Sequence, residues 1–242
     1  VEWQKYLLVK IYANIVNHYL RMWDYTSPQR VDYYIANSEE TRLRIQKFYR
    51  RDASVIYPPV DIPSKFKNSV ENKHSYFITV SRLARVKHID LLIKTANKLK
   101  VNLKIVGQGR DLPYLKEMAG ETVEFVENAD DNKLKDLLSR AKAFLFAAVD
   151  EEFGIAPVEA MGYGIPVIAY ESGGLKETVE HQVNGYLYKE LSIDSLSQQI
   201  RNLNKLSDNQ YLNMRESAYR GSRKYSEESF KKNILRFLNK VS

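Results

Sequence analysis

A regular alternation of short apolar runs and helical patterns fills residues 75–169 and constrains the fold more than any other feature. We predict strands at 75–80, 102–106, 122–126, 143–148 and 166–169, and helices over 88–99, 110–119, 131–140 and 155–162. Strands that alternate with helices in this way form a parallel sheet that is covered on both faces. The sequence therefore predicts an α/β fold with a Rossmann-like, doubly wound parallel sheet.

Further elements are predicted on both sides of this region. Before it, we predict a helix over 2–22, a strand at 31–36, a helix from an N-cap at Ser38 to about Arg51, and a short strand at 54–57. Three prolines within 58–63 mark residues 58–73 as a linker. After it, we predict helices over 191–206 and 209–224, and a last helix that begins at Ser226 and reaches Val241.

Length and composition limit the class of protein. The 242 residues, 44% of them hydrophobic, suffice for one large domain or one and a half smaller ones. The absence of cysteine excludes a disulfide scaffold and fits a reducing compartment. Because the sequence shows neither a signal-peptide pattern nor an apolar run long enough to span a bilayer, we expect a cytoplasmic protein.

Positive charge favours anionic partners. The net charge is +7, and residues 220–240 contain seven basic and two acidic side chains. Lipid headgroups, nucleotides and nucleic acid would all be attracted, although a solvated helix face explains the pattern equally well. The amphipathic pattern of 2–22 fits either a core-facing helix or a helix on an anionic membrane surface, which would place the protein peripherally at the inner face of the plasma membrane.

Candidate binding residues follow three of the predicted strands. They are Ser81 and Arg82 after the first, Gly107–Gly109 after the second, and Asp150–Gly154 after the fourth. Doubly wound sheets bind ligands at the carboxyl ends of strands where the connections diverge. Residues 151–162 also place Glu151 and Glu159 on either side of a glycine-containing turn into a helix. Backbone N–H groups at such a turn bind phosphate, and carboxylates accept hydrogen bonds from sugar hydroxyls, so the pattern indicates a ligand that contains both.

Residues 151–162 resemble the E-x7-E motif of retaining glycosyltransferases with the GT-B fold, in the large family 4 of glycosyl transferases group 1. The similarity continues upstream in Val80–Leu83 with Lys87, and downstream in residues 164–169, 172–174 and 177–179. Residues 30–38 and 57–61 are similar to the bacterial and archaeal O-antigen mannosyltransferase branch. The resemblance therefore covers nearly the whole chain.

This resemblance implies a domain organisation. Residues 1–62 would be a remnant of the N-terminal, acceptor-binding Rossmann-like domain together with the hinge. Residues 63–224 would form the C-terminal nucleotide-sugar-binding domain. Residues 225–242 would be a helix that packs back on the N-terminal part. The absence of an initiator methionine and of most of the first domain predicts a truncated chain.

The resemblance also implies catalytic roles for Arg82, Lys87 and Glu151. Arg82 and Lys87 would bind the diphosphate, whose negative charge grows as its bond to the sugar breaks. Glu151 would contact hydroxyls of the donor sugar. Glu151 and Glu159 are not expected to act as an acid–base pair around a scissile bond, which makes hydrolysis by paired carboxylates the weaker interpretation.

The remaining donor-binding residues are implied in the same way. Backbone amides of Phe153, Gly154 and Ile155 would face the sugar and its phosphate, with Gly154 permitting close approach. Glu159 would receive the ribose 2′- and 3′-hydroxyls.

The nucleobase is expected near residues 125–129, with Asn128 and Ala129 as binding residues. Family members usually have glycine at the position of Glu127. A carboxylate there would accept hydrogen bonds from guanine, which mildly favours GDP, whereas simple surface exposure explains Glu127 better.

We expect no metal and no cofactor. The sequence has no Asp-x-Asp or His-Glu-x-x-His motif, and its histidines are scattered. Arg82, Lys87 and the helix dipole would replace a cation beside the diphosphate.

The sequence therefore predicts an enzyme that transfers a sugar, mannose from GDP-mannose with UDP-sugars second, to a glycan or lipid-linked acceptor with retention. The alternative is a donor-nucleotide-binding module or subunit that is inactive without a partner or the missing domain. A dinucleotide-dependent oxidoreductase is disfavoured because Gly107 and Gly109 lack a third glycine at the required spacing. Nucleic acid is not an expected partner, since no recognised reader motif is present.

Overall fold

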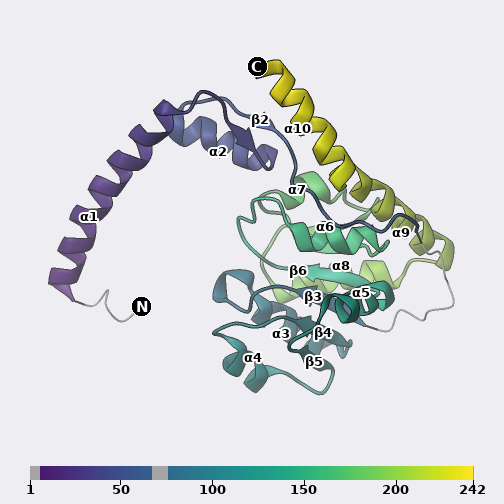
Figure 1. The fold of residues 1–242 in the computed structure, drawn as a ribbon. Coiled ribbons are helices and arrows are strands. Elements are labelled where there is room, and N and C mark those ends of the chain that lie inside the picture. The colour runs from purple at the N-terminus through teal and green to yellow at the C-terminus, as the bar shows by residue number, and fades with distance from the viewer. Residues whose placement is uncertain (1–5, 67–75, 242) are drawn as a thin grey trace. The chain divides into compact units, whose positions relative to one another are not determined.

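The computed structural model describes residues 6–66 and 76–241 (Figure 1). The chain divides into two compact units, Val1–Ile56 and Tyr57–Ser242. No described helix offers the length of apolar surface that a bilayer crossing requires.

The larger unit is built on a six-stranded sheet. Its strands are β3 (Phe77–Val80), β4 (Leu103–Val106), β5 (Val123–Val126), β6 (Ala143–Phe146), β7 (Val167–Tyr170) and β8 (Gly185–Tyr188). They lie in the order β5-β4-β3-β6-β7-β8, and every pair of neighbours is parallel. This arrangement confirms the predicted Rossmann-like, doubly wound α/β fold.

Helices connect these strands, and three more follow the last strand. They are α3 (Ile89–Leu99), α4 (Leu112–Met118), α5 (Asp131–Arg140), α6 (Ile155–Gly162), α7 (Leu175–Thr178), α8 (Ile193–Asn204), α9 (Asp208–Ser222) and α10 (Glu227–Val241). All but the short α7 were predicted, and Ser226 caps α10 by accepting a hydrogen bond from the Ser229 N–H at 3.3 Å.

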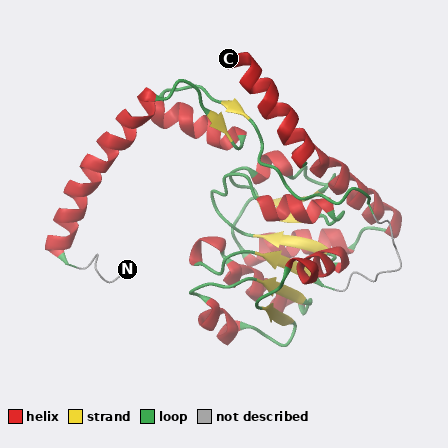
Figure 2. Cartoon of the chain, in the orientation of Figure 1, coloured by secondary structure: helices red, strands yellow, loops and turns green. Residues whose placement is uncertain are grey.

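Side chains alternate between the two faces of the sheet, as the period of a strand requires. In β6, Ala143 and Leu145 join one apolar cluster, while Phe144 and Phe146 join the other. Residues of α3 and α8 complete the first cluster, and residues of α5 and α6 complete the second. Figure 2 shows the strands between helices on either side. The central strand is therefore buried on both faces, which explains why its sequence is a continuous apolar run.

The prediction of a linker at 58–73 is only partly right. Val60 is 3% exposed, and its N–H donates to the Tyr225 carbonyl at 2.9 Å. It packs with Phe153, Val158 and Tyr225 in a small apolar cluster. The start of the linker is thus fixed to the larger unit, because its apolar side chains find a buried site beside α6. Residues 67–73 lie outside the described residues.

The smaller unit contains α1 (Leu7–Thr26), a 3-10 turn (Ser27–Arg30), β1 (Ile35–Ala36), α2 (Glu39–Tyr49) and β2 (Ser54–Val55). β1 and β2 pair in parallel and are shorter than predicted. The predicted N-cap is confirmed, since the Ser38 hydroxyl accepts a hydrogen bond from the Thr41 N–H at 3.0 Å. α1 has no buried residue, so its apolar face is exposed in this unit.

Truncation of the central strand tests the account of the core. Leu145 is 0% exposed, so Leu145→Ala leaves a cavity and should lower the free energy of unfolding by about 2–5 kcal/mol. The measurement is urea denaturation followed by circular dichroism. Leu235→Ala on α10, where the side chain is 59% exposed, is the control and should change stability by less than about 0.5 kcal/mol. Equal effects at the two positions would contradict the assignment of the core.

Candidate functional site

The strand order reverses between β3 and β6. The connection from β3 leads through α3 to β4 on one side, and the connection from β6 leads through α6 to β7 on the other. The carboxyl ends of two such strands border a crevice in which doubly wound proteins bind ligands. Arg82 and Lys87 follow β3, and Glu151 follows β6. The three residues predicted to be catalytic therefore lie on the two loops that border this point.

An ion pair joins the two loops. Lys87 Nζ donates to Glu151 Oε2 at 2.5 Å, and the two side chains are 22% and 26% exposed. Lys87 Nζ also lies 5.8 Å from the centre of the Phe146 ring at the end of β6. The structure thus brings two of the predicted catalytic residues, 64 positions apart in the sequence, into direct contact.

Arg82 is exposed, and its side chain makes no hydrogen bond or ion pair with any other residue that the structure describes. Its guanidinium is therefore available to an anionic ligand. Across residues 6–66 and 76–241, no three His, Asp or Glu side chains are grouped to hold a metal ion. That the site works without a metal stays a prediction.

The turn into α6 presents its backbone. Phe153 is 3% exposed, and its ring packs against Tyr225 and Tyr57 at centroid distances of 5.1 and 5.8 Å. Gly154 adopts φ 88°, a left-handed conformation that favours glycine, and no side chain caps the helix. Ile155 is 51% exposed. The Phe153 side chain is directed into the core and no side chain caps the helix. The unsatisfied N–H groups of the helix start are therefore available to a ligand such as the predicted phosphate.

The loop after β7 supports the Glu151 loop. The Gly174 N–H donates to the Glu151 carbonyl at 2.8 Å, and the Asp150 N–H donates to the Ser172 hydroxyl at 2.9 Å. A Cβ on Gly173, which has φ 56°, would lie 2.0 Å from the Glu151 carbonyl oxygen. Sequence reasoning noted these residues only as part of a resemblance. Gly173 and Gly174 allow the backbones of two loops to approach each other closely. The pair of adjacent glycines in the sequence was the signal that could have predicted this role.

A second pair of glycines holds the loops after β3 and β4 together. A Cβ on Gly107 would lie 2.1 Å from the Ser81 carbonyl oxygen, and one on Gly109 equally close to that of Leu83. The Leu83 N–H donates to the Gln108 carbonyl at 2.8 Å. These glycines therefore serve the packing of one loop on another, which accounts for them without a dinucleotide.

Glu159 lies in a different neighbourhood from Glu151. It is partly buried on α6 and makes no hydrogen bond to another described residue. Burial raises the pKa of its carboxyl above the ordinary value, the nearby Asp61 carboxylate adds to the rise, and Lys135 opposes it. Glu151 is paired with a cation, whereas Glu159 has none in hydrogen-bonding contact. The two carboxylates can thus address different parts of one extended ligand.

The predicted base-binding loop follows β5. Asn128 adopts φ 55° and accepts a hydrogen bond from the Gln108 side chain, which links this loop to the one after β4. Ala129 packs against the core cluster beneath it. The Glu127 carboxylate accepts a hydrogen bond from Lys116 Nζ at 2.6 Å. This exposed ion pair accounts for Glu127 and leaves no structural argument for guanine.

The model of the family described as glycosyl transferases group 1 matches residues 61–221. The chain belongs to this family. Two curated relatives of this chain are the GtfA subunit of UDP-N-acetylglucosamine–peptide N-acetylglucosaminyltransferase from Streptococcus pneumoniae and the GDP-Man:Man(3)GlcNAc(2)-PP-Dol alpha-1,2-mannosyltransferase from Xenopus laevis. The first is 27% identical over 74% of this chain and 38% of its own length. The second is 28% identical over 75% of this chain and 43% of its own length. The chain therefore spans less than half of either relative.

Solved structures agree on the fold. Anabaena Alr3699/HepE, in complex with UDP and glucose, superposes with a TM-score of 0.79 at 22% identity, over 91% of this chain and 66% of that one. The pneumococcal O-GlcNAc transferase GtfA, in complex with UDP and GlcNAc, gives 0.74 at 24% identity, over 90% of this chain and 47% of that one. These neighbours support the GT-B assignment. The narrower resemblance to the O-antigen branch, and the truncation, stay predictions.

Substitution of Gly173 tests the contact between the loops. Gly173→Ala forces a side chain into the left-handed region and against the Glu151 carbonyl, and should lower the free energy of unfolding by about 1–3 kcal/mol. Gly221→Ala is the control, because its Cβ would meet nothing closer than 3.4 Å and it lies within α9, where alanine stabilises by about 0.5–1 kcal/mol. Thermal and urea unfolding should show opposite signs for the two variants. A neutral result for Gly173→Ala would contradict the close approach.

The raised pKa of Glu159 predicts a dependence on pH. A carboxyl with a higher pKa in the folded state binds protons more tightly there, so its contribution favours folding below the ordinary value of 4.5 and is lost as pH rises through the raised pKa of the folded state. Glu159→Gln removes the buried charge and should raise the melting temperature at pH 7 relative to the parent. The difference should shrink towards pH 4. Melting curves between pH 4 and 8 measure this difference in melting temperature. A difference that grows on acidification would contradict burial as the cause of the raised pKa.

Proposed function

We propose that this chain is the donor-binding part of a retaining glycosyltransferase, which moves a sugar from a nucleoside-diphosphate sugar to a glycan or lipid-linked acceptor. The observation that carries the proposal is the Lys87–Glu151 ion pair across the reversal of strand order, beside the uncapped start of α6. Cation, carboxylate and helix N–H groups are the partners that a sugar diphosphate needs. Membership of the glycosyl transferases group 1 family supports the same reaction.

The diphosphate would be bound by Arg82, Lys87 and the start of α6. The Lys87 ammonium has three N–H donors, so one on Glu151 leaves two for phosphate oxygens. When the bond between the anomeric carbon and the diphosphate oxygen breaks, its electron pair stays on the leaving diphosphate. Fixed cations at that position stabilise the transition state more than the ground state, and each is worth on the order of 3 kcal/mol by analogy with oxyanion-hole donors.

The two carboxylates would bind the hydroxyls at either end of the donor. Glu151, held by Lys87, is placed to accept hydrogen bonds from the sugar. Glu159, whose ionised form lacks a hydrogen-bonding partner among the described residues, would gain one from each ribose hydroxyl it receives. Hydrogen bonds to a carboxylate favour its charged form, so ribose binding would offset the effect of burial on Glu159.

We propose GDP-mannose as the donor, with UDP-sugars second. The mannosyltransferase names among the relatives support mannose, and the GtfA relatives and the UDP complexes support the second choice. A role in surface polysaccharide such as O-antigen follows from the resemblance of residues 30–38 and 57–61 to that branch. We place the protein in the cytoplasm, peripherally at the inner face of the plasma membrane, which the exposed apolar face of α1 and the basic residues of 220–240 support.

A donor-binding module without activity of its own is the second candidate. The observation that favours it is the length of the chain, which spans 38% and 43% of the two relatives described above. Transfer with retention requires a cleft in which one wall binds the donor and the facing wall binds the acceptor. A subunit or domain outside this sequence could supply that second wall.

Removal of the Arg82 charge tests the proposed diphosphate site. Arg82→Ala should weaken binding of GDP or UDP about tenfold or more, since a charge-assisted hydrogen bond is worth about 1.5–3 kcal/mol. Arg85→Ala, an exposed arginine on the same loop, is the matched control and should leave the affinity within about twofold. Isothermal titration calorimetry measures both variants. Equal losses in the two would show general charge attraction and contradict a specific site.

Binding and turnover separate the two candidates. The purified chain is titrated with GDP-mannose, UDP-glucose, UDP-GlcNAc and an ADP-sugar, and release of nucleoside diphosphate is then followed with a lipid-linked or glycan acceptor. Binding with turnover supports the enzyme, and binding without turnover supports the module. Failure of every nucleotide sugar to bind would contradict both.

A further inference from the structure

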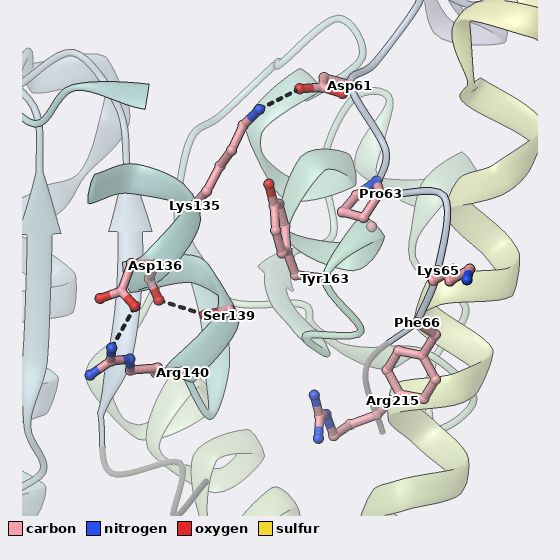
Figure 3. A pocket seen from close by; sticks show the side chains of 11 residues that line it. Asp61, Pro63, Lys65, Phe66, Lys135, Asp136, Ser139, Arg140, Tyr163 and Arg215 are labelled. Carbon is pink, nitrogen blue, oxygen red and sulfur yellow. Dashed lines mark hydrogen bonds and ion pairs between the residues drawn. The ribbon is translucent and has the colours of Figure 1, made fainter. Parts of the chain in front are cut away.

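A cavity of about 600 Å³ lies between the linker and α5. Its walls are the linker residues 61–66, α5, the end of α6 and Arg215 of α9, as Figure 3 shows. Arg82, Lys87, Glu151 and Glu159 do not line it. The cavity therefore shares no residue with the proposed donor site, although Asp61 and Lys135 on its wall lie near Glu159.

Arg215 is the unusual residue of this cavity. It is 3% exposed, and no carboxylate of a described residue lies within ion-pair distance of it. Its Nε donates to the Gly164 carbonyl at 3.0 Å, and the guanidinium stacks on the Phe66 ring at 5.4 Å from its centre. In Figure 3 the guanidinium points from α9 towards the cavity. The Nε–H group of the guanidinium is thus held by the protein. The other N–H groups remain available to a ligand in the cavity.

The surroundings hold this arginine in place. A Cβ on Gly164, which has φ 69°, would lie 2.2 Å from the Phe66 ring, so the glycine makes room for the stack. The Tyr219 ring stacks on the Phe66 ring with 5.4 Å between their centroids, and its hydroxyl donates to the Pro63 and Ser64 carbonyls. Burial lowers the pKa of the Arg215 guanidinium. A buried cation without an anionic partner is unfavourable, so a buried arginine that is held in this way indicates a site for an anionic ligand.

The other charges on the walls are largely matched. Lys135 pairs with Asp61 at 3.1 Å, and Arg140 pairs with Asp136 at 2.6 Å. Lys65 and Arg215 have no such acid among the described residues, so the lining carries an excess of two positive charges. The Tyr163 phenol, whose pKa is raised by burial, adds a neutral hydroxyl donor. The cavity therefore combines an available guanidinium with a donor that would suit an oxygen-rich ligand.

We propose that this cavity binds a small molecule that carries an oxyanion group, a phosphate ester or a carboxylate, and that Arg215 is its anion-binding residue. The planar guanidinium fork matches two oxygens of either group. The volume falls within the range of about 300–1,000 Å³ that small-molecule sites occupy. Because the walls come from the linker and from the helix that carries Glu159, an occupant would hold the linker against α6.

Calorimetry with defined anions tests the proposal. The 242-residue chain is titrated with glucose 6-phosphate, citrate and inorganic phosphate, with uncharged glucose as the ligand control. We expect glucose 6-phosphate or citrate to bind, and their relative affinities distinguish a phosphate ester from a carboxylate. Arg215→Met should weaken that binding at least tenfold, and Arg215→Lys should weaken it less. No binding by any of the anions would overturn the proposal.

Arg220→Met is the matched control, since Arg220 lies on the same helix, is exposed and pairs with Glu216 at 2.6 Å. It should leave anion binding within twofold, and an equal loss in both variants would overturn the role of Arg215. GDP or UDP binding should be unchanged in Arg215→Met. A parallel loss of nucleotide affinity would mean that Arg215 contributes to the donor site, which overturns a separate cavity. The Arg82→Ala titration tests the proposed function independently of this outcome.

A second variant covers the case in which Arg215→Met fails to fold, as judged by circular dichroism. Ser139→Glu retains Arg215 and places a negative charge on the opposite wall, on α5. It should reduce anion affinity by a similar factor. Unchanged affinity in this variant would overturn the assignment.

Discussion

The contact between Lys87 and Glu151 joins two loops that the topology of the sheet sends in opposite directions. β3 and β6 are neighbours, yet their connections cover different sides of the sheet, and this side-chain contact bridges the two loops at the carboxyl ends of the strands. A half-buried ion pair is weak evidence for stability, because desolvation opposes the attraction. Its consequence lies in orientation: the carboxylate and the ammonium are fixed before a ligand arrives, and Arg82 is left as an exposed cation beside them.

That fixed geometry depends on backbones that approach one another closely. Gly107 and Gly173 each stand where a Cβ would lie about 2 Å from a carbonyl oxygen of the neighbouring loop. One contact fastens the loop of Arg82 to that of β4, and the other fastens the loop of Glu151 to that of β7. Sites whose supporting residues are locked by packing keep their geometry, so these glycines act on chemistry through position alone.

The sequence predicted the parts of the fold that periodicity determines. The apolar run at 143–148 indicated a buried strand, and Ser38 has the side chain of an N-cap. β8 was missed because Gly185–Tyr188 is short, begins with glycine and shows no alternation that separates it from a turn. The partner of Glu151, 64 residues away, and the burial of Arg215 have no local signal, since both arise from tertiary packing.

The linker has an electrostatic connection to the proposed ribose site. Asp61 raises the pKa of Glu159, while Lys135, which pairs with Asp61 at 3.1 Å, lowers it. Any movement of the linker that separates Asp61 from Lys135 changes both influences together. Glu159 is thus a carboxyl kept in a partly buried position that disfavours its own charge, and hydroxyl donors from a ribose would relieve that penalty. A residue held in this way lowers the stability of the ligand-free protein and strengthens its interaction with a ligand. Such a trade-off between stability and function is common at binding sites.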